Sequence, residues 1–197
     1  RVIEVTKALS AYFENFNLPI GIITNVGGFS QDAPLSFKER VKRLAILRES
    51  LSELRDPQVQ IWPQTMPPFP WHFGGQRFHN LFVEADEIVE FCNDLNMRIC
   101  LDVSHSRLAC NHTNQSFQLF LEKVLPFTSH LHIADSRGVD GEGLQINTGE
   151  VDFYALGEAM QKFSPEASWI PEVWQGHENQ GEGFWCALER LESQNVF

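Results

Sequence analysis

Short apolar runs alternate along the chain with longer segments in which apolar residues recur every three or four positions. The runs fall at residues 18–26, 59–62, 98–105, 130–135 and 168–174, and they are rich in strand-favouring residues. The clearest helical segment begins with a capping box, Ser36 to Glu39. Its expected inward residues are Phe37, Val41, Leu44, Leu47, Leu51 and Leu54. Strands that alternate with helices predict parallel βαβ units.

A polar residue stands at or near the carboxyl end of four of these strands: Gln64, Asp102, His132 and Glu172. In a doubly wound sheet such residues need not meet, whereas in a (β/α)8 barrel the strand ends converge on one face. The polar strand ends therefore favour a TIM barrel. A buried lone carboxylate is very costly, so Asp102 needs a basic side chain or a metal beside it.

Two carboxylates and an imidazole are suitable ligands for a divalent cation. Each residue also has a plain structural reading. Asp102 and Glu172 could form salt bridges, and His132 could be a hydrogen-bonded core histidine. The metal-site hypothesis rests on having one candidate ligand on each successive strand end.

The composition narrows the function classes. The 197 residues suit one domain, and 26 acidic against 15 basic residues give a net charge of −11. That balance argues against a protein that binds nucleic-acid backbones. No apolar run reaches the roughly 20 residues of a membrane span, and we expect no signal peptide. Four scattered cysteines indicate reduced thiols, so we expect a cytoplasmic protein without membrane partners.

Aromatic residues, prolines, glycines and two histidines crowd into residues 67–79. A long aromatic loop after a strand is typical of a lid or pocket wall, and we expect Trp71 and Phe73 to shield a pocket. A subunit interface in a homo-oligomer is the competing interpretation. Cys110 and His112 lack partners at zinc-site spacing, so we expect them in a surface loop.

The residues around these strands resemble a known family. The Asp-Val-Ser-His stretch at 102–105, the His132 strand and the Glu172 strand resemble the metal-binding strands of the xylose-isomerase-like TIM-barrel superfamily. Residues 62–71 and 170–176 are similar to sugar phosphate isomerase/epimerase-like proteins, some of them linked to sialic-acid-synthase-type enzymes. The resemblance covers nearly the whole chain. It implies a single domain over residues 1–197 that holds the last five of eight βα units, with the amino-terminal strands missing.

The resemblance also implies residue roles. Asp102, His132 and Glu172, with Gln64, would hold a divalent ion such as Mn, Mg, Co or Zn. The expected substrate contacts are His105, Arg137, Trp71 and His72, and the expected catalytic residues are Glu172 and His105. Enzymes of this superfamily exchange protons through two facing glutamates, and Gln64 takes the place of one. A glutamine cannot take up a proton. Three alternatives therefore stay open: a reaction with one base, a different second base such as His72 or His79, or no catalytic activity.

The leading functional hypothesis is a metal-dependent isomerase or epimerase acting on a small-molecule sugar or sugar phosphate. The alternative is a non-catalytic sugar-sensing or scaffold domain that serves a partner enzyme, which Gln64 motivates. An apurinic-site endonuclease fits the barrel, but it does not fit the acidic charge.

Overall fold

Five parallel strands in chain order form the frame of the protein, as the sequence predicts. The computed structural model describes residues 1–11, 20–72 and 75–194. The five strands are β1 (Gly21–Thr24), β3 (Gln60–Pro63), β7 (Ile99–Asp102), β8 (Thr128–Ile133) and β11 (Ser168–Pro171). β1 pairs with β3, β8 lies between β7 and β11, and a parallel bridge from Gln64 to Cys100 joins the two groups. Within the described ranges this sheet stays open, as expected for part of a barrel.

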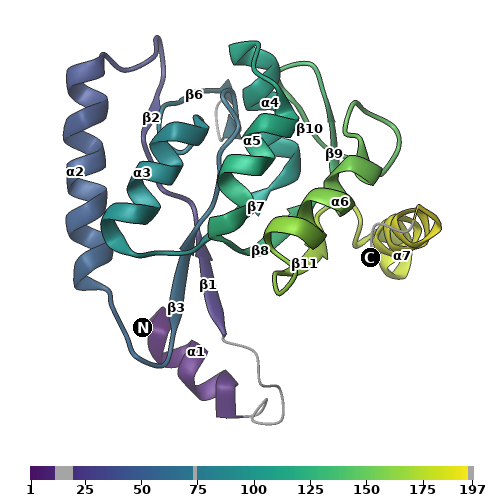
Figure 1. The fold of residues 1–197 in the computed structure, drawn as a ribbon, viewed down its shortest axis with the longest axis horizontal. Helices are drawn as coiled ribbons and strands as arrows, with labels where there is room; N and C mark the ends of the chain where they lie inside the picture. Colours follow the sequence, from purple (N-terminus) through teal and green to yellow (C-terminus); the bar gives the residue numbers. More distant parts are fainter. Residues whose placement is uncertain (12–19, 73–74, 195–197) are drawn as a thin grey trace.

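Helices precede, connect and follow the strands along the chain, and some of them lie over one face of the sheet (Figure 1). They are α1 (Val2–Ser10), α2 (Phe37–Glu53), α3 (Ala85–Leu95), α4 (Val103–Thr113), α5 (Phe117–Val124), α6 (Phe153–Phe163) and α7 (Glu178–Ser193), with a 3-10 turn at Leu125–Phe127. Short strands form three antiparallel pairs: β2 (Phe29–Ser30) with β6 (Phe78–His79), β4 (Trp71–His72) with β5 (Gly75–Gln76), and β9 (Asp135–Arg137) with β10 (Gly141–Leu144). The last pair lies in the loop that leads from β8 to α6.

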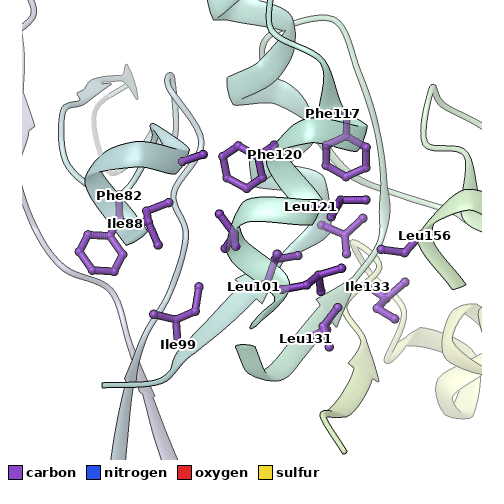
Figure 2. Packing of buried hydrophobic residues seen from close by; sticks show 14 of the residues in the cluster. Phe82, Ile88, Ile99, Leu101, Phe117, Phe120, Leu121, Leu131, Ile133 and Leu156 are labelled. Carbon is purple, nitrogen blue, oxygen red and sulfur yellow. The ribbon is translucent and has the colours of Figure 1, made fainter. Parts of the chain in front are cut away.

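The hydrophobic core lies between the strands and the helices (Figure 2). Successive strand residues point to opposite faces. Ile99 and Leu101 of β7 and Leu131 and Ile133 of β8 pack under the helices, and all four are fully buried. Removing each such side chain from water stabilises the fold by about 1.5 to 3 kcal/mol. The alternate residues of the same strands therefore face the other way, and these include Asp102, His130 and His132.

Polar side chains start four of the helices. Ser36 forms the predicted capping box with Glu39, and Asp102, Ser116 and Asp152 each accept the backbone N–H three residues on. Such caps satisfy donors that a helix leaves free at its start. Asp102 thus ends β7 and begins α4 at the same residue.

The predicted inward face of α2 is wrong at both ends of the helix. Leu44 and Leu51 are buried as expected, but Phe37 is 81% exposed, and Val41 and Leu54 are also exposed. Near its start α2 instead forms ion pairs with residues at the start of α3. The Arg40 guanidinium donates to the carboxylates of Glu84 and Glu87 at 2.9 and 2.8 Å. In α1 the apolar residues Val5 and Leu9 are exposed, and the next residues at the same helical spacing, Tyr12, Phe13 and Phe16, lie outside the described residues.

The expectation of a surface loop at Cys110 and His112 is also wrong. Both residues belong to α4, where Cys110 is buried in the core and the His112 ring packs edge-on against Phe69 at 4.7 Å. The four cysteines are free thiols. No helix in the described part of the chain is long and apolar enough to cross a membrane.

His130 is expected to make the fold acid-sensitive. Its burial and the nearby His132 lower the pKa of His130 from 6.5 to about 4. Between pH 6.5 and 4 the His130 imidazole is therefore protonated in the unfolded chain but neutral in the folded chain. As the pH falls through this range, the free energy of unfolding decreases by up to about 3 kcal/mol. Urea unfolding of metal-free protein across this range should show a shallower fall for His130→Gln. Equal pH dependence in both proteins would contradict this prediction.

Candidate metal centre

The polar ends of four strands converge on one site, as the sequence predicts. Gln64 follows β3, Asp102 ends β7 and His132 lies in β8, and Asp102 and His132 are register partners across the sheet. The Gln64 side-chain amide donates to the Asp102 carboxylate at 2.9 Å, and its nitrogen lies 3.4 Å from His132 Nδ1. Neighbouring parallel strands thus bring together residues that are up to 68 positions apart.

Glu172 completes the group from the segment after β11. Its backbone N–H donates to the Ile133 carbonyl at 3.0 Å, which ties the segment to the end of β8. Glu172 Oε2 lies 2.6 Å from His132 Nδ1, and the same ring nitrogen lies 3.8 Å from Asp102 Oδ2. One potential ligand atom from each of Asp102, His132 and Glu172 lies within 4.8 Å of the others. Asp102 and His132 are buried, whereas the Glu172 side chain is 53% exposed.

The electrostatics of this group favour a cation between the carboxylates. Burial raises the pKa of Asp102, and the nearby Glu172 carboxylate raises it further against the opposing effect of His105. Burial would also raise the pKa of Glu172, but the hydrogen bond and charge of His132, together with smaller contributions from Asp102 and His105, outweigh it and lower that pKa. Two carboxylates, one imidazole and a neutral amide form a donor set that fits a divalent metal ion.

His105 lies beside Asp102 and orients it. Its backbone N–H donates to Asp102 Oδ1 at 2.9 Å. Its ring Nδ1 lies 3.0 Å from the Thr65 carbonyl and 3.3 Å from Asp102 Oδ2, and its Nε2 lies 3.4 Å from Glu142 Oε2. Burial alone would lower the pKa of His105, but the carboxylates of Asp102 and Glu142 raise it to about 9. The ring is therefore protonated at neutral pH, and each of its nitrogens faces an acceptor.

A cavity of about 320 Å³ opens on this group of residues. It is lined by Asp102, Ser104, His105, Glu142, Gly143, Glu172, Val173 and Trp174. The sequence interpretation assigned no role to Glu142, Trp174 or Thr65. Trp174 lies two residues after Glu172, and Glu142 stands between two glycines in the charged loop after β8. Thr65 accepts the Asp102 N–H at 2.9 Å through a hydroxyl that nothing in the sequence marks as special.

The sequence profile of one family, described as xylose isomerase-like TIM barrel, matches residues 1–191. The chain belongs to this family. The solved structures agree with the assignment of the fold. A D-tagatose 3-epimerase-like protein matches with a TM-score of 0.66 and 20% identity over 89% of this chain and 63% of that chain. Our chain therefore spans less than two thirds of that protein.

Two further barrels of similar shape match more of the chain. A probable 3-DHS dehydratase from Bacillus anthracis matches with a TM-score of 0.64 and 15% identity, over 96% of this chain and 69% of that chain. The IOLI protein, solved with a bound zinc atom, has a TM-score of 0.64 and 13% identity over 100% of this chain and 70% of that chain. None of the curated proteins compared with the chain matches it significantly.

Two predicted substrate contacts of this xylose isomerase-like barrel, Arg137 and Trp71, do not line the cavity. The Arg137 guanidinium donates to the Thr148 carbonyl of its own loop. Trp71 is 57% exposed and does not line the cavity. The His72 side chain and Phe73 lie outside the described residues. The roles of Arg137, Trp71 and His72 stay predictions.

Gly143 packs tightly against Trp174 in the wall of the cavity. It has φ +68, and a β-carbon added there would overlap the Trp174 ring. Its carbonyl also accepts the Trp174 N–H at 2.8 Å. We expect Gly143→Ala to lower the free energy of unfolding by about 2 to 4 kcal/mol, from the disfavoured φ and the clash together.

Gly138 offers a matched control for that substitution. It has a similar φ of +66, but an added β-carbon would meet nothing within 4 Å. Gly138→Ala should therefore show the cost of the backbone strain without the clash, about 1 kcal/mol. Urea unfolding of both variants measures the difference. Equal costs would show that Trp174 moves aside freely, and the near-ultraviolet circular dichroism of the tryptophans would then change.

Proposed function

We propose that this protein is a divalent-metal-dependent isomerase or epimerase of a sugar or sugar phosphate. The observation that carries the proposal is the convergence of Asp102, His132 and Glu172 on one point beside a cavity of about 320 Å³. Gln64 would be the fourth ligand, through its amide oxygen. Two similar structures, a D-tagatose 3-epimerase-like protein and a barrel solved with a bound zinc atom, support the same chemistry.

The bound ion would supply a Lewis acid that polarises a carbonyl and an adjacent hydroxyl of the sugar. The chain's own residues then have distinct roles. Glu172, the most exposed of the three ligands, would take the proton from the carbon next to the carbonyl. Protonated His105 lines the cavity and would donate a hydrogen bond to a substrate oxygen. The indole of Trp174 offers an apolar surface for one face of the sugar ring.

The test is the exchange of a carbon-bound proton of the sugar with deuterium from the solvent. Full-length protein loaded with Mn²⁺, Mg²⁺, Co²⁺ or Zn²⁺ is incubated in D₂O with ketoses, aldoses and their phosphates. Deuterium is expected at the carbon that loses its proton, detected by NMR, and chelation of the metal should abolish the signal. Absence of exchange in every combination of metal and sugar would sink the enzymatic proposal.

A sugar-binding domain without catalysis is the second candidate function. Gln64 favours it, because an amide in place of a carboxylate keeps a possible ligand but removes a base. Gln64→Glu separates the two candidates. If the wild type binds sugar without exchange and the variant gains exchange, the chain is a binding domain. If the wild type already exchanges protons, it is an enzyme.

A further inference from the structure

The proposed reaction lacks a second group that can carry a proton. Inverting a carbon next to a carbonyl requires removal of a proton from one face and delivery of a proton to the other. Glu172 serves one face. Gln64, beside Asp102, can neither accept nor release a proton under ordinary conditions. The second group must therefore be one of the other side chains that line the cavity.

We propose that Glu142 is the second proton-transfer residue of this cavity and that the reaction is a two-base epimerisation. This inference rests on the proposed function. Glu142 and Glu172 line the same cavity. They lie at the two ends of one chain of contacts: Glu142 to His105 at 3.4 Å, His105 to Asp102 at 3.3 Å, and then through His132 to Glu172 at 2.6 Å.

The contacts of Glu142 differ from those of a structural carboxylate. Asp135, which starts β9 in the same loop, is such a structural carboxylate. It accepts three backbone N–H groups and is fully buried. Glu142 makes one ionic contact among the described residues, to the His105 ring, and it is 16% exposed within the cavity. A carboxylate that is held from one side and open to a cavity on the other can reach a bound molecule.

The loop that carries Glu142 is held against the segment that carries Glu172. The Gly143 carbonyl accepts the Trp174 N–H at 2.8 Å, and the Trp174 ring occupies the space where a side chain at 143 would lie. Leu144, on the other side, is the strand partner of Asp135. Glu142 and Glu172 therefore lie on backbone segments that are hydrogen-bonded to each other. This hydrogen bond holds the two glutamates at a fixed separation.

His79, the other described candidate for the second base, lies elsewhere. Its ring packs edge-on against the Phe29 ring at 4.5 Å, next to the β2–β6 pair. It does not line the cavity that opens on Asp102. Among the described residues that line this cavity, Glu142 and Glu172 are the carboxylates left once Asp102 is assigned wholly to the metal.

The proton balance closes without any co-reactant. One carboxylate breaks the C–H bond and keeps the proton, while the electron pair of that bond moves into the carbonyl and gives an enediolate. The other carboxyl group, protonated beforehand, delivers its proton to the opposite face of the carbon. One turnover thus leaves one group protonated and the other ionised, and exchange with water restores the starting state.

The experiment uses Glu142→Gln in full-length, metal-loaded protein, with each of two epimers incubated separately in D₂O. We expect epimerisation to fall by about 100-fold or more. The epimer whose proton faces Glu172 should still take up deuterium without inversion, whereas the other epimer should show none. Binding of the sugar, measured by calorimetry, should change by less than about threefold. Glu158→Gln, an exposed carboxylate on α6, is the matched control and should behave as the wild type.

Each result decides the question. Undiminished epimerisation by Glu142→Gln overturns the inference and leaves the proposed function intact. Loss of deuterium uptake by both epimers, with folding and metal content preserved, also overturns it, because a missing second base spares one of the two half-reactions. A wild type that exchanges no proton overturns the proposed function itself, and this inference with it.

Discussion

Replacing Asp135 with alanine is expected to lower the free energy of unfolding by about 3 to 5 kcal/mol. The carboxylate is fully buried and accepts the N–H groups of Ser136 and Val151 on one oxygen and of Gly149 on the other, at 2.7 to 3.0 Å. Alanine would leave these three donors without an acceptor. A side chain at Gly149 would overlap the same carboxylate, so the loop has closed tightly around it.

Asp152→Ala is the control for this substitution. Asp152 also accepts a backbone N–H, that of Ala155 at 3.0 Å, but it is an exposed helix cap. Its loss should cost about 1 kcal/mol. Urea unfolding of the two variants measures both values. Similar costs would mean that water replaces the Asp135 carboxylate, and the β9–β10 region would then be more open than the structure shows.

The sequence predicts the barrel frame and the group of polar residues at the strand ends for a common physical reason. In parallel strands the buried face reads as a nearly continuous apolar run, so an isolated polar residue at its end stands out. Gln64, Asp102, His132 and Glu172 all carry that signal. Because the carboxyl ends of parallel strands lie at the same edge of the sheet, identifying these four residues also predicts that their side chains lie close together. Hydrogen-bond distances of 2.6 to 3.4 Å among them confirm the convergence.

The residues that the sequence interpretation missed lack such a signal. Glu142 lies in a loop where charged residues are common, and its place in the cavity depends on a strand pair, β9–β10, that has no clear period-2 pattern. α4 was missed because Val103 continues the apolar run of β7, so the strand and the helix read as one segment. The structure separates them at Asp102, whose side chain caps the helix.

The exposed Phe37 marks another limit of pattern reading. Helical periodicity identifies a face, but it does not give the length over which a neighbour covers that face. On α2 the buried stripe runs through Leu44 and Leu51, while Arg40 reaches across to Glu84 and Glu87 of the α3 region. Only the packing of α2 against α3 decides where apolar contact gives way to ion pairs.

Asp102→Asn is expected to lower the affinity for a divalent metal ion by about 100-fold or more. The substitution removes a negative charge and a ligand oxygen, and even the partners of metal ligands contribute about 10- to 100-fold. It keeps the volume of the side chain and an oxygen for the His105 N–H, so the cap of α4 is retained. Titration calorimetry with Mn²⁺ or Zn²⁺ measures the loss.

The stability of the metal-free Asp102→Asn protein separates a ligand from a structural ion pair. Burial and the Glu172 carboxylate raise the pKa of Asp102, so at neutral pH its charge opposes folding in the absence of metal. Removing that charge should change the free energy of unfolding by no more than about 1 kcal/mol, because Gln64 can turn its amide oxygen toward the new amide. A buried salt bridge that loses one partner would instead cost about 3 to 5 kcal/mol. Lost metal binding with retained stability therefore identifies Asp102 as a ligand, and a large loss of stability assigns it to its ion pair with His105.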